Sequence, residues 1–85
     1  MLIDVRTPEE YATGHADGAI NIPAGDIAAG ELGMLVDIDR NTLLELYCHS
    51  GARAQYVAGI LQSFGFANVT NLGGLEAALR IHPKH

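Results

Sequence analysis

The stretch that decides the fold runs from Leu43 to Gly65 and reads LLELYCHSGARAQYVAGILQSFG. It opens with an apolar run, Leu43–Tyr47, which predicts a buried strand. From Arg53 onward, apolar residues recur at the spacing of one helix face, and Gly65 is placed to end that helix. The residues predicted on this face are Tyr56, Val57, Ile60, Leu61 and Phe64. The stretch therefore predicts a strand, a tight loop and a helix in succession.

The loop between the strand and the helix begins with the only cysteine of the 85 residues. It comprises Cys48, His49, Ser50, Gly51 and Ala52. The first N–H groups of a helix have no helical partner, so they can converge on an anion in the loop. The helix N-terminus and the charge of Arg53 both favour a thiolate over a thiol. We therefore predict an anion-binding site with Cys48 as its nucleophile and with Gly51 at a positive φ.

The acidic residues avoid this part of the chain. Nine of the ten lie at or before Glu45, and the tenth is Glu76, so that residues 46–75 hold no carboxylate and one arginine. The protein as a whole has a net charge of −5. A lone cysteine is often only a small buried apolar residue. However, the carboxyl end of a strand is where open α/β sheets bind ligands, which favours the functional interpretation of Cys48.

The rest of the chain alternates short strands with helices. Further strands are predicted at Leu2–Val5, Ala19–Ile22 and Asn68–Asn71. Helices are predicted from Pro8 to Gly14, around Asp26–Ala29 and Glu31–Val36, and at Leu75–Ile81, with a tight turn at Gly73-Gly74 before the last one. Thr7 and Glu10 form the pattern of a capping box. Such alternation predicts one α/β domain over residues 1–85, with a small, mainly parallel sheet and helices on both faces.

Four segments, in order, resemble the rhodanese (thiosulfate sulfurtransferase) family. Cys48–Arg53 resembles its active loop, whose common form is C-x-x-G-x-R. The other three are Leu2–Arg6, similar to its opening strand, Glu10–Pro23, similar to its E-[FY]-x-x-G-H-I-x-G-A-x-N-I-P signature, and Val69–Gly74, similar to its closing V-x-x-L-x-G-G. Together they cover nearly the whole chain, and the strongest likeness is to small single-domain members of the phage-shock type.

This resemblance implies a rhodanese-like fold and a thiosulfate sulfurtransferase. Cys48 would take the sulfane sulfur of an anionic donor as a persulfide and pass it to cyanide or a thiol. His49, Ser50, Gly51, Ala52 and Arg53 are the residues expected to bind the donor, and His49 departs from the arginine common at its place. We expect no cofactor, and the tail with His82 and His85 does not suggest a metal site.

Polar residues outside the loop are predicted to have structural roles. Asp4 and Arg6 are expected to form a pair that ties the opening strand to its neighbours. His15 is expected to pack and to form hydrogen bonds, because a thiol that is already ionised needs no general base.

Two alternatives remain open at this level. One is a phosphatase or arsenate reductase, which resembles C-x5-R; here Arg53 comes one position too early. Mercaptopyruvate sulfurtransferases, a nearer relative, differ at the positions of His49 and Arg53. The other is a non-catalytic rhodanese-like module for binding or regulation, against which the presence of Cys48 argues.

Composition restricts the partners. The pI of about 5.1 argues against nucleic acid, and no apolar run is long enough to cross a membrane. A monomer or a homodimer is expected. The chain has no signal-peptide pattern and as written predicts a cytoplasmic protein, or a periplasmic one if Met1 replaces a cleaved signal peptide.

Overall fold

Four parallel strands form one sheet in the computed structural model, which describes residues 1–83. The strands are β1 (Leu2–Asp4), β2 (Ile20–Asn21), β3 (Leu44–Cys48) and β4 (Val69–Gly74), and their order in the sheet is β2-β1-β3-β4. Each pair of neighbouring strands is parallel, which confirms the predicted α/β class. His85, which the sequence analysis placed in the polar tail, lies outside the described residues.

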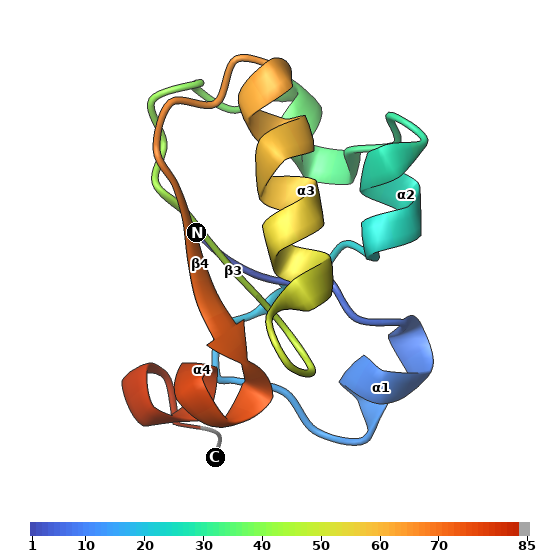
Figure 1. Ribbon diagram of the computed structural model, residues 1–85, viewed down its shortest axis with the longest axis vertical. Helices are drawn as coiled ribbons and strands as arrows, with labels where there is room; N and C mark the ends of the chain where they lie inside the picture. The colour runs from blue at the N-terminus through green and yellow to red at the C-terminus, as the bar shows by residue number, and fades with distance from the viewer. Residues whose placement is uncertain (84–85) are drawn as a thin grey trace.

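Helices lie on both faces of this sheet (Figure 1). They are α1 (Pro8–Ala12), α2 (Ala24–Ala28), the 3₁₀ helix η1 (Gly33–Asp37), α3 (Ala52–Ser63) and α4 (Leu75–Ile81). The predicted capping box of α1 is present, with Thr7 and Glu10 bonding to each other's backbone N–H groups. Within residues 1–83, no helix combines the length and the apolar character of a membrane span.

The central strand β3 separates two cores because its side chains alternate between the faces. Leu44, Leu46 and Cys48 belong to the larger core, which α2, η1 and α3 cover. Tyr47 belongs to the smaller core on the α4 side. Glu45, the one charged residue of the predicted apolar run, is half-buried, and its Oε1 lies 3.3 Å from Nε2 of His82.

The buried face of α3 differs from the predicted one. Tyr56 is 65% exposed and Phe64 is 42% exposed, although both were expected to face the core. The residues buried along α3 are Ala54, Val57, Ala58 and Leu61. Two of these four residues are alanines, whose small side chains allow close packing of a helix.

The end of α3 is as predicted. Gly65 has a φ of 98°, and the N–H groups of Gly65 and Phe66 donate to the carbonyls of Gln62 and Leu61. This is the predicted helix end, with Phe66 folded back and buried.

The prediction of a turn at Gly73-Gly74 is wrong. Both residues belong to β4, whose pairing with β3 shifts register after Asn71 and then continues to Gly74.

Candidate active site

The Cys48 thiol lies where β3 meets the N-terminus of α3. Cys48 is the last residue of β3 and is 1% exposed. Its Sγ accepts a 2.9 Å hydrogen bond from the backbone N–H of Gly51. Gly51 has a φ of 99°, as predicted, a left-handed conformation that favours glycine at this position.

Two opposing effects set the pKa of the Cys48 thiol. Burial is the largest single effect and raises the pKa. Backbone N–H groups of Ala54, Gly51, Ser50 and Arg53 together outweigh it, so the pKa is lowered. The thiolate is therefore favoured by backbone dipoles at the start of α3, which is the physical basis of a nucleophilic cysteine.

Contacts with β4 hold the loop in place. Asn71 Nδ2 donates to the carbonyl oxygen of Gly51 at 3.1 Å, and Asn71 Oδ1 accepts the N–H of Gly73 at 2.8 Å. Ser50 and Gly74 form an isolated antiparallel bridge. Asn71 is not predicted as a site residue from the sequence, because nothing in its local pattern separates it from an ordinary strand residue.

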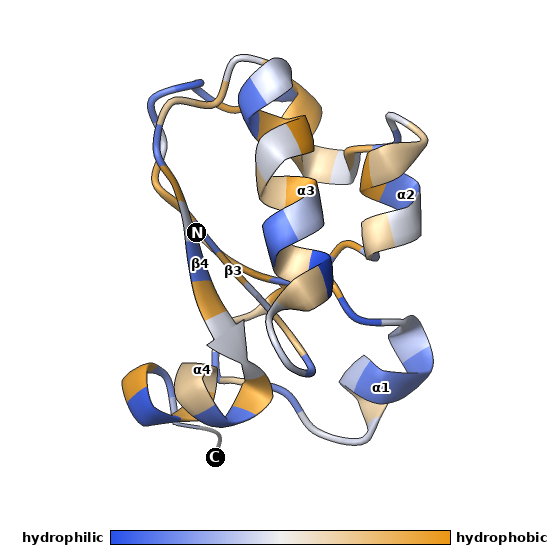
Figure 2. Ribbon diagram, viewed as in Figure 1, coloured by the Kyte–Doolittle hydropathy of each residue, from blue (hydrophilic) through white to orange (hydrophobic). Residues whose placement is uncertain are grey.

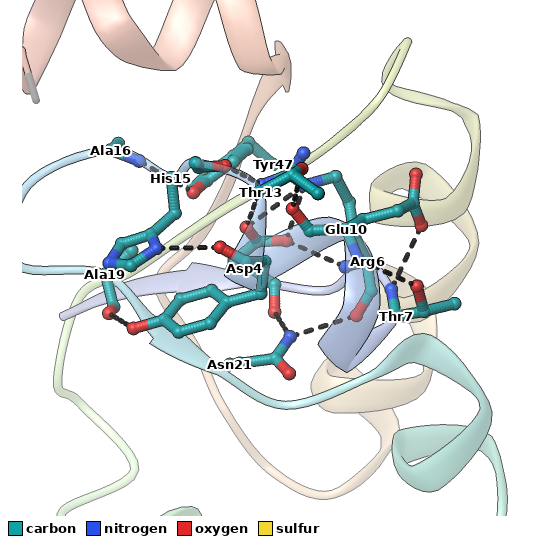
Figure 3. A network of polar contacts seen from close by, with 12 residues as sticks. Asp4, Arg6, Thr7, Glu10, Thr13, His15, Ala16, Ala19, Asn21 and Tyr47 are labelled. Carbon is teal, nitrogen blue, oxygen red and sulfur yellow. Dashed lines mark hydrogen bonds and ion pairs between the residues drawn. The ribbon is translucent and has the colours of Figure 1, made fainter.

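The side chain of Arg53 has a fixed partner. Its Nη1 lies 2.8 Å from Glu10 Oε1 and its Nη2 lies 3.1 Å from Glu10 Oε2. The sequence predicts only a capping role in α1 for Glu10, and Glu10 also has that role (Figure 3). The pair holds the pKa of Glu10 at about 2, chiefly through the hydrogen bonds from Arg53 and then through the N–H of Thr7. The Arg53 cation is thus matched by a carboxylate.

The other predicted loop residues reach solvent. His49, Ser50 and Ala52 are exposed. His49 lines a cavity of about 350 Å³. The rest of its lining comes from α4: Leu75, Glu76 and Leu79. The loop therefore adjoins an open, mostly apolar space on the α4 side.

Asp4 and Arg6 form the predicted structural pair (Figure 3). Both are buried, and Arg6 Nη2 lies 2.7 Å from Asp4 Oδ2. The same Nη2 donates to the carbonyl of Gly14 at 2.7 Å.

His15 stacks on Tyr11 with ring centroids 3.7 Å apart, and its Nδ1 lies 2.9 Å from the Tyr11 carbonyl. His15 is thus a packing residue, as predicted. Among residues 1–83, no three His, Cys, Asp or Glu side chains gather as metal ligands would.

Comparison with known proteins extends this description. A family model described as "Rhodanese-like domain" matches residues 1–80. The chain is 38% identical over 74 residues to "Thiosulfate sulfurtransferase PspE" of Escherichia coli, and the match covers 87% of this chain and 69% of that protein. It is 32% identical over 77 residues to the "tRNA uridine(34) hydroxylase" of Erwinia tasmaniensis, covering 87% of this chain but 22% of that enzyme.

A solved structure gives the same result for the fold. The structure described as "rhodanese with anions from E. coli" superposes with a TM-score of 0.77 at 36% sequence identity. The superposition covers 89% of this chain and 87% of that one. The similarity therefore extends over nearly the whole sheet and its helices.

Proposed function

The chain belongs to the rhodanese-like domain family, and on that premise we propose that it moves the sulfane sulfur of thiosulfate to cyanide or a thiol through a persulfide on Cys48. Relatives named as sulfurtransferases support sulfur transfer as the general chemistry. The main support for the proposal comes from the loop that begins at Cys48. Its backbone N–H groups lower the pKa of the Cys48 thiol and point toward one anionic sulfur.

In the first step, the Cys48 thiolate attacks the outer sulfur of thiosulfate. The S–S bond of thiosulfate breaks, sulfite leaves with the bonding electron pair, and the transferred sulfur stays on Cys48 as a persulfide. The N–H groups that favour the thiolate are also in place to stabilise the persulfide anion, in the manner of an oxyanion hole. Arg53 lies beside the loop, and its effect on an anionic donor is reduced by its partner Glu10.

In the second step, an acceptor removes the outer sulfur. The carbon of cyanide attacks that sulfur, the S–S bond of the persulfide breaks, and thiocyanate leaves while the Cys48 thiolate is restored. A thiolate acceptor would form a new persulfide in the same way. Cys48 is the only cysteine of the 85 residues, so the acceptor must come from outside them.

The cavity beside His49 is the proposed approach for a thiol acceptor. Leu75 and Leu79 offer apolar surface to the carbon skeleton of such a molecule, and Glu76 adds a negative charge at its rim. The cavity borders the loop through His49, the residue that follows Cys48.

Other substrates have less support. Arg53 follows Cys48 by five positions, one fewer than in the C-x5-R loop of the phosphatases and arsenate reductases. The likeness to the tRNA-modifying hydroxylase concerns 22% of that enzyme, and the net charge of −5 disfavours RNA. The presence of Cys48, with a thiol pKa that is lowered, argues against a purely binding module.

Intact mass spectrometry tests the proposal directly. Incubation with thiosulfate should add the mass of one sulfur atom, and cyanide should then remove it with formation of thiocyanate. The Cys48→Ser variant, checked for folding by circular dichroism, should gain no sulfur. A wild-type protein that stays unmodified would overturn the proposal, and hydrolysis of an aryl phosphate by it would favour the phosphatase alternative.

A further inference from the structure

The salt bridge between α1 and α3 joins two residues that are 43 positions apart in the sequence. Arg53 lies in the first turn of α3, directly after the loop, and its two terminal nitrogens bind the two oxygens of Glu10. Such bidentate pairs fix the orientation of the guanidinium as well as its distance from the carboxylate. The carboxylate of Glu10 therefore determines where the Arg53 guanidinium lies relative to Cys48.

Polar contacts help to hold Glu10 in this place. The helix α1 contains no buried residue, and its ribbon is coloured mainly as hydrophilic (Figure 2). Glu10 Oε1 accepts the N–H of Thr7 at 3.1 Å, and the next residue, Tyr11, donates from its hydroxyl to the carbonyl of Ala19 at 2.6 Å. One carboxylate thus completes the helix cap and meets Arg53 at the same time.

The charge balance at the loop depends on this carboxylate. Arg53 is the only cation among residues 46–75, and its side chain is 39% exposed, against 34% for Glu10. The pKa of Glu10, at about 2, keeps it ionised over the whole range in which the protein would work. An anion that approaches Cys48 therefore meets a neutral pair and a set of backbone dipoles, and not a free positive charge.

We propose that Glu10 is a specificity-determining residue: by pairing with Arg53 it compensates the positive charge of that side chain and so limits the preference of Cys48 for anionic over neutral reagents. For sulfur donors this inference rests on the proposed sulfur transfer. It applies equally to any reagent that reaches the Cys48 sulfur.

Two alkylating reagents separate the inference from the proposed function. Iodoacetate carries a negative charge and iodoacetamide is neutral, while both alkylate the same thiolate and have nearly the same shape. The ratio of their rates at Cys48 therefore measures the attraction of anions. Restricted access to the sulfur slows both reagents equally and does not affect the ratio. Sulfur transfer plays no part in this measurement.

The decisive variant is Glu10→Gln, which keeps the size of the side chain and removes its charge. The ratio of the iodoacetate rate to the iodoacetamide rate should rise about two- to fivefold, the range for a partly exposed ion pair, and the rise should shrink in 1 M salt. The KM for thiosulfate should fall by a similar factor with kcat less affected. Arg53→Ala should lower the rate ratio.

Two control variants exclude simpler explanations. Glu9→Gln makes the same change of net charge on the exposed face of the same helix, and Thr7→Ala weakens the same capping box without changing any charge. Neither should move the ratio by more than about 1.5-fold, because neither residue pairs with Arg53.

An unchanged ratio in Glu10→Gln would overturn the inference, as would an equal rise in Glu9→Gln or in Thr7→Ala. A changed ratio in a protein that takes no sulfur from thiosulfate would uphold the role of Glu10 and reject the proposed function alone.

Discussion

Gly74 faces the carbonyl oxygen of His49 so closely that a Cβ atom at Gly74 would overlap it. Gly74 is also paired with Cys48 in the sheet and forms the bridge to Ser50. Its φ of −90° is open to any residue, so the need for glycine here is one of space alone. The end of β4 and the Cys48 loop therefore lie backbone against backbone at Gly74, as they do between Gly73 and Gly51.

Gly74→Ala should therefore displace the loop. Both contacting groups are backbone, so the change should cost about 1–3 kcal/mol of stability, as overpacking does, and should slow the alkylation of Cys48 by iodoacetamide about tenfold or more. Urea denaturation and alkylation rates measure the two effects.

Gly59→Ala is the matched control. Gly59 lies in the middle of α3, is exposed and has open space around its Cα, so the alanine should stabilise the protein by about 0.5–1 kcal/mol. Alkylation of Gly74→Ala at the wild-type rate would contradict the assigned contact.

The reactivity of Cys48 should depend on pH in a defined direction. Because the pKa of its thiol is lowered in the folded protein, the rate of alkylation should reach half its maximum at a lower pH than in the urea-unfolded chain. The unfolded chain then holds more protons between the two pKa values, so the stability should rise with pH through that window. The rise should be absent from Cys48→Ser. A folded midpoint equal to or above the unfolded one would show that burial outweighs the N–H groups.

The sequence predicted those features that depend on neighbouring residues. The capping box at Thr7 and the glycine end of α3 are local, and the structure contains both. The buried face of α3 was predicted only in part, because the predicted face and the observed buried face have only Val57 and Leu61 in common. The choice between them depends on how closely the helix approaches the sheet, which no local pattern contains.

The same distinction applies to the candidate site. A strand, a loop and a helix in succession suffice to predict N–H groups around Cys48, because helix geometry sets their direction. The partner of Arg53 could not be predicted in this way. Glu10 already had a local role in the cap, and only the fold brings α1 beside the start of α3.

The buried pair of Asp4 and Arg6 should be essential for stability. Asp4→Asn leaves the Arg6 charge buried without its counter-ion, so the free energy of unfolding should fall by about 3–5 kcal/mol. Glu45→Gln is the control, because the contact of Glu45 with His82 is partly exposed; it should change stability by less than about 1 kcal/mol. Urea denaturation at pH 7 measures both. An equal effect of the two changes would mean that the buried charge of Arg6 is relieved in some other way.

Tyr47 offers a test of whether the two faces of β3 act separately. Its hydroxyl is buried and accepts the N–H of Ala16 at 3.0 Å, and burial raises the pKa of that hydroxyl to about 12. Tyr47→Phe removes the acceptor and leaves a buried N–H without a partner, which should cost about 1–3 kcal/mol. Tyr56→Phe, at a position 65% exposed, should change stability by less than about 0.5 kcal/mol.

Because Tyr47 faces the α4 side and Cys48 the α3 side, the Tyr47→Phe protein should alkylate at Cys48 at the wild-type rate under conditions in which it remains folded. Urea denaturation gives the loss of stability, and the iodoacetamide rate gives the reactivity. A loss of reactivity equal to that of Gly74→Ala would mean that the smaller core helps to shape the loop, and that the alternation of side chains along β3 does not keep the two faces independent.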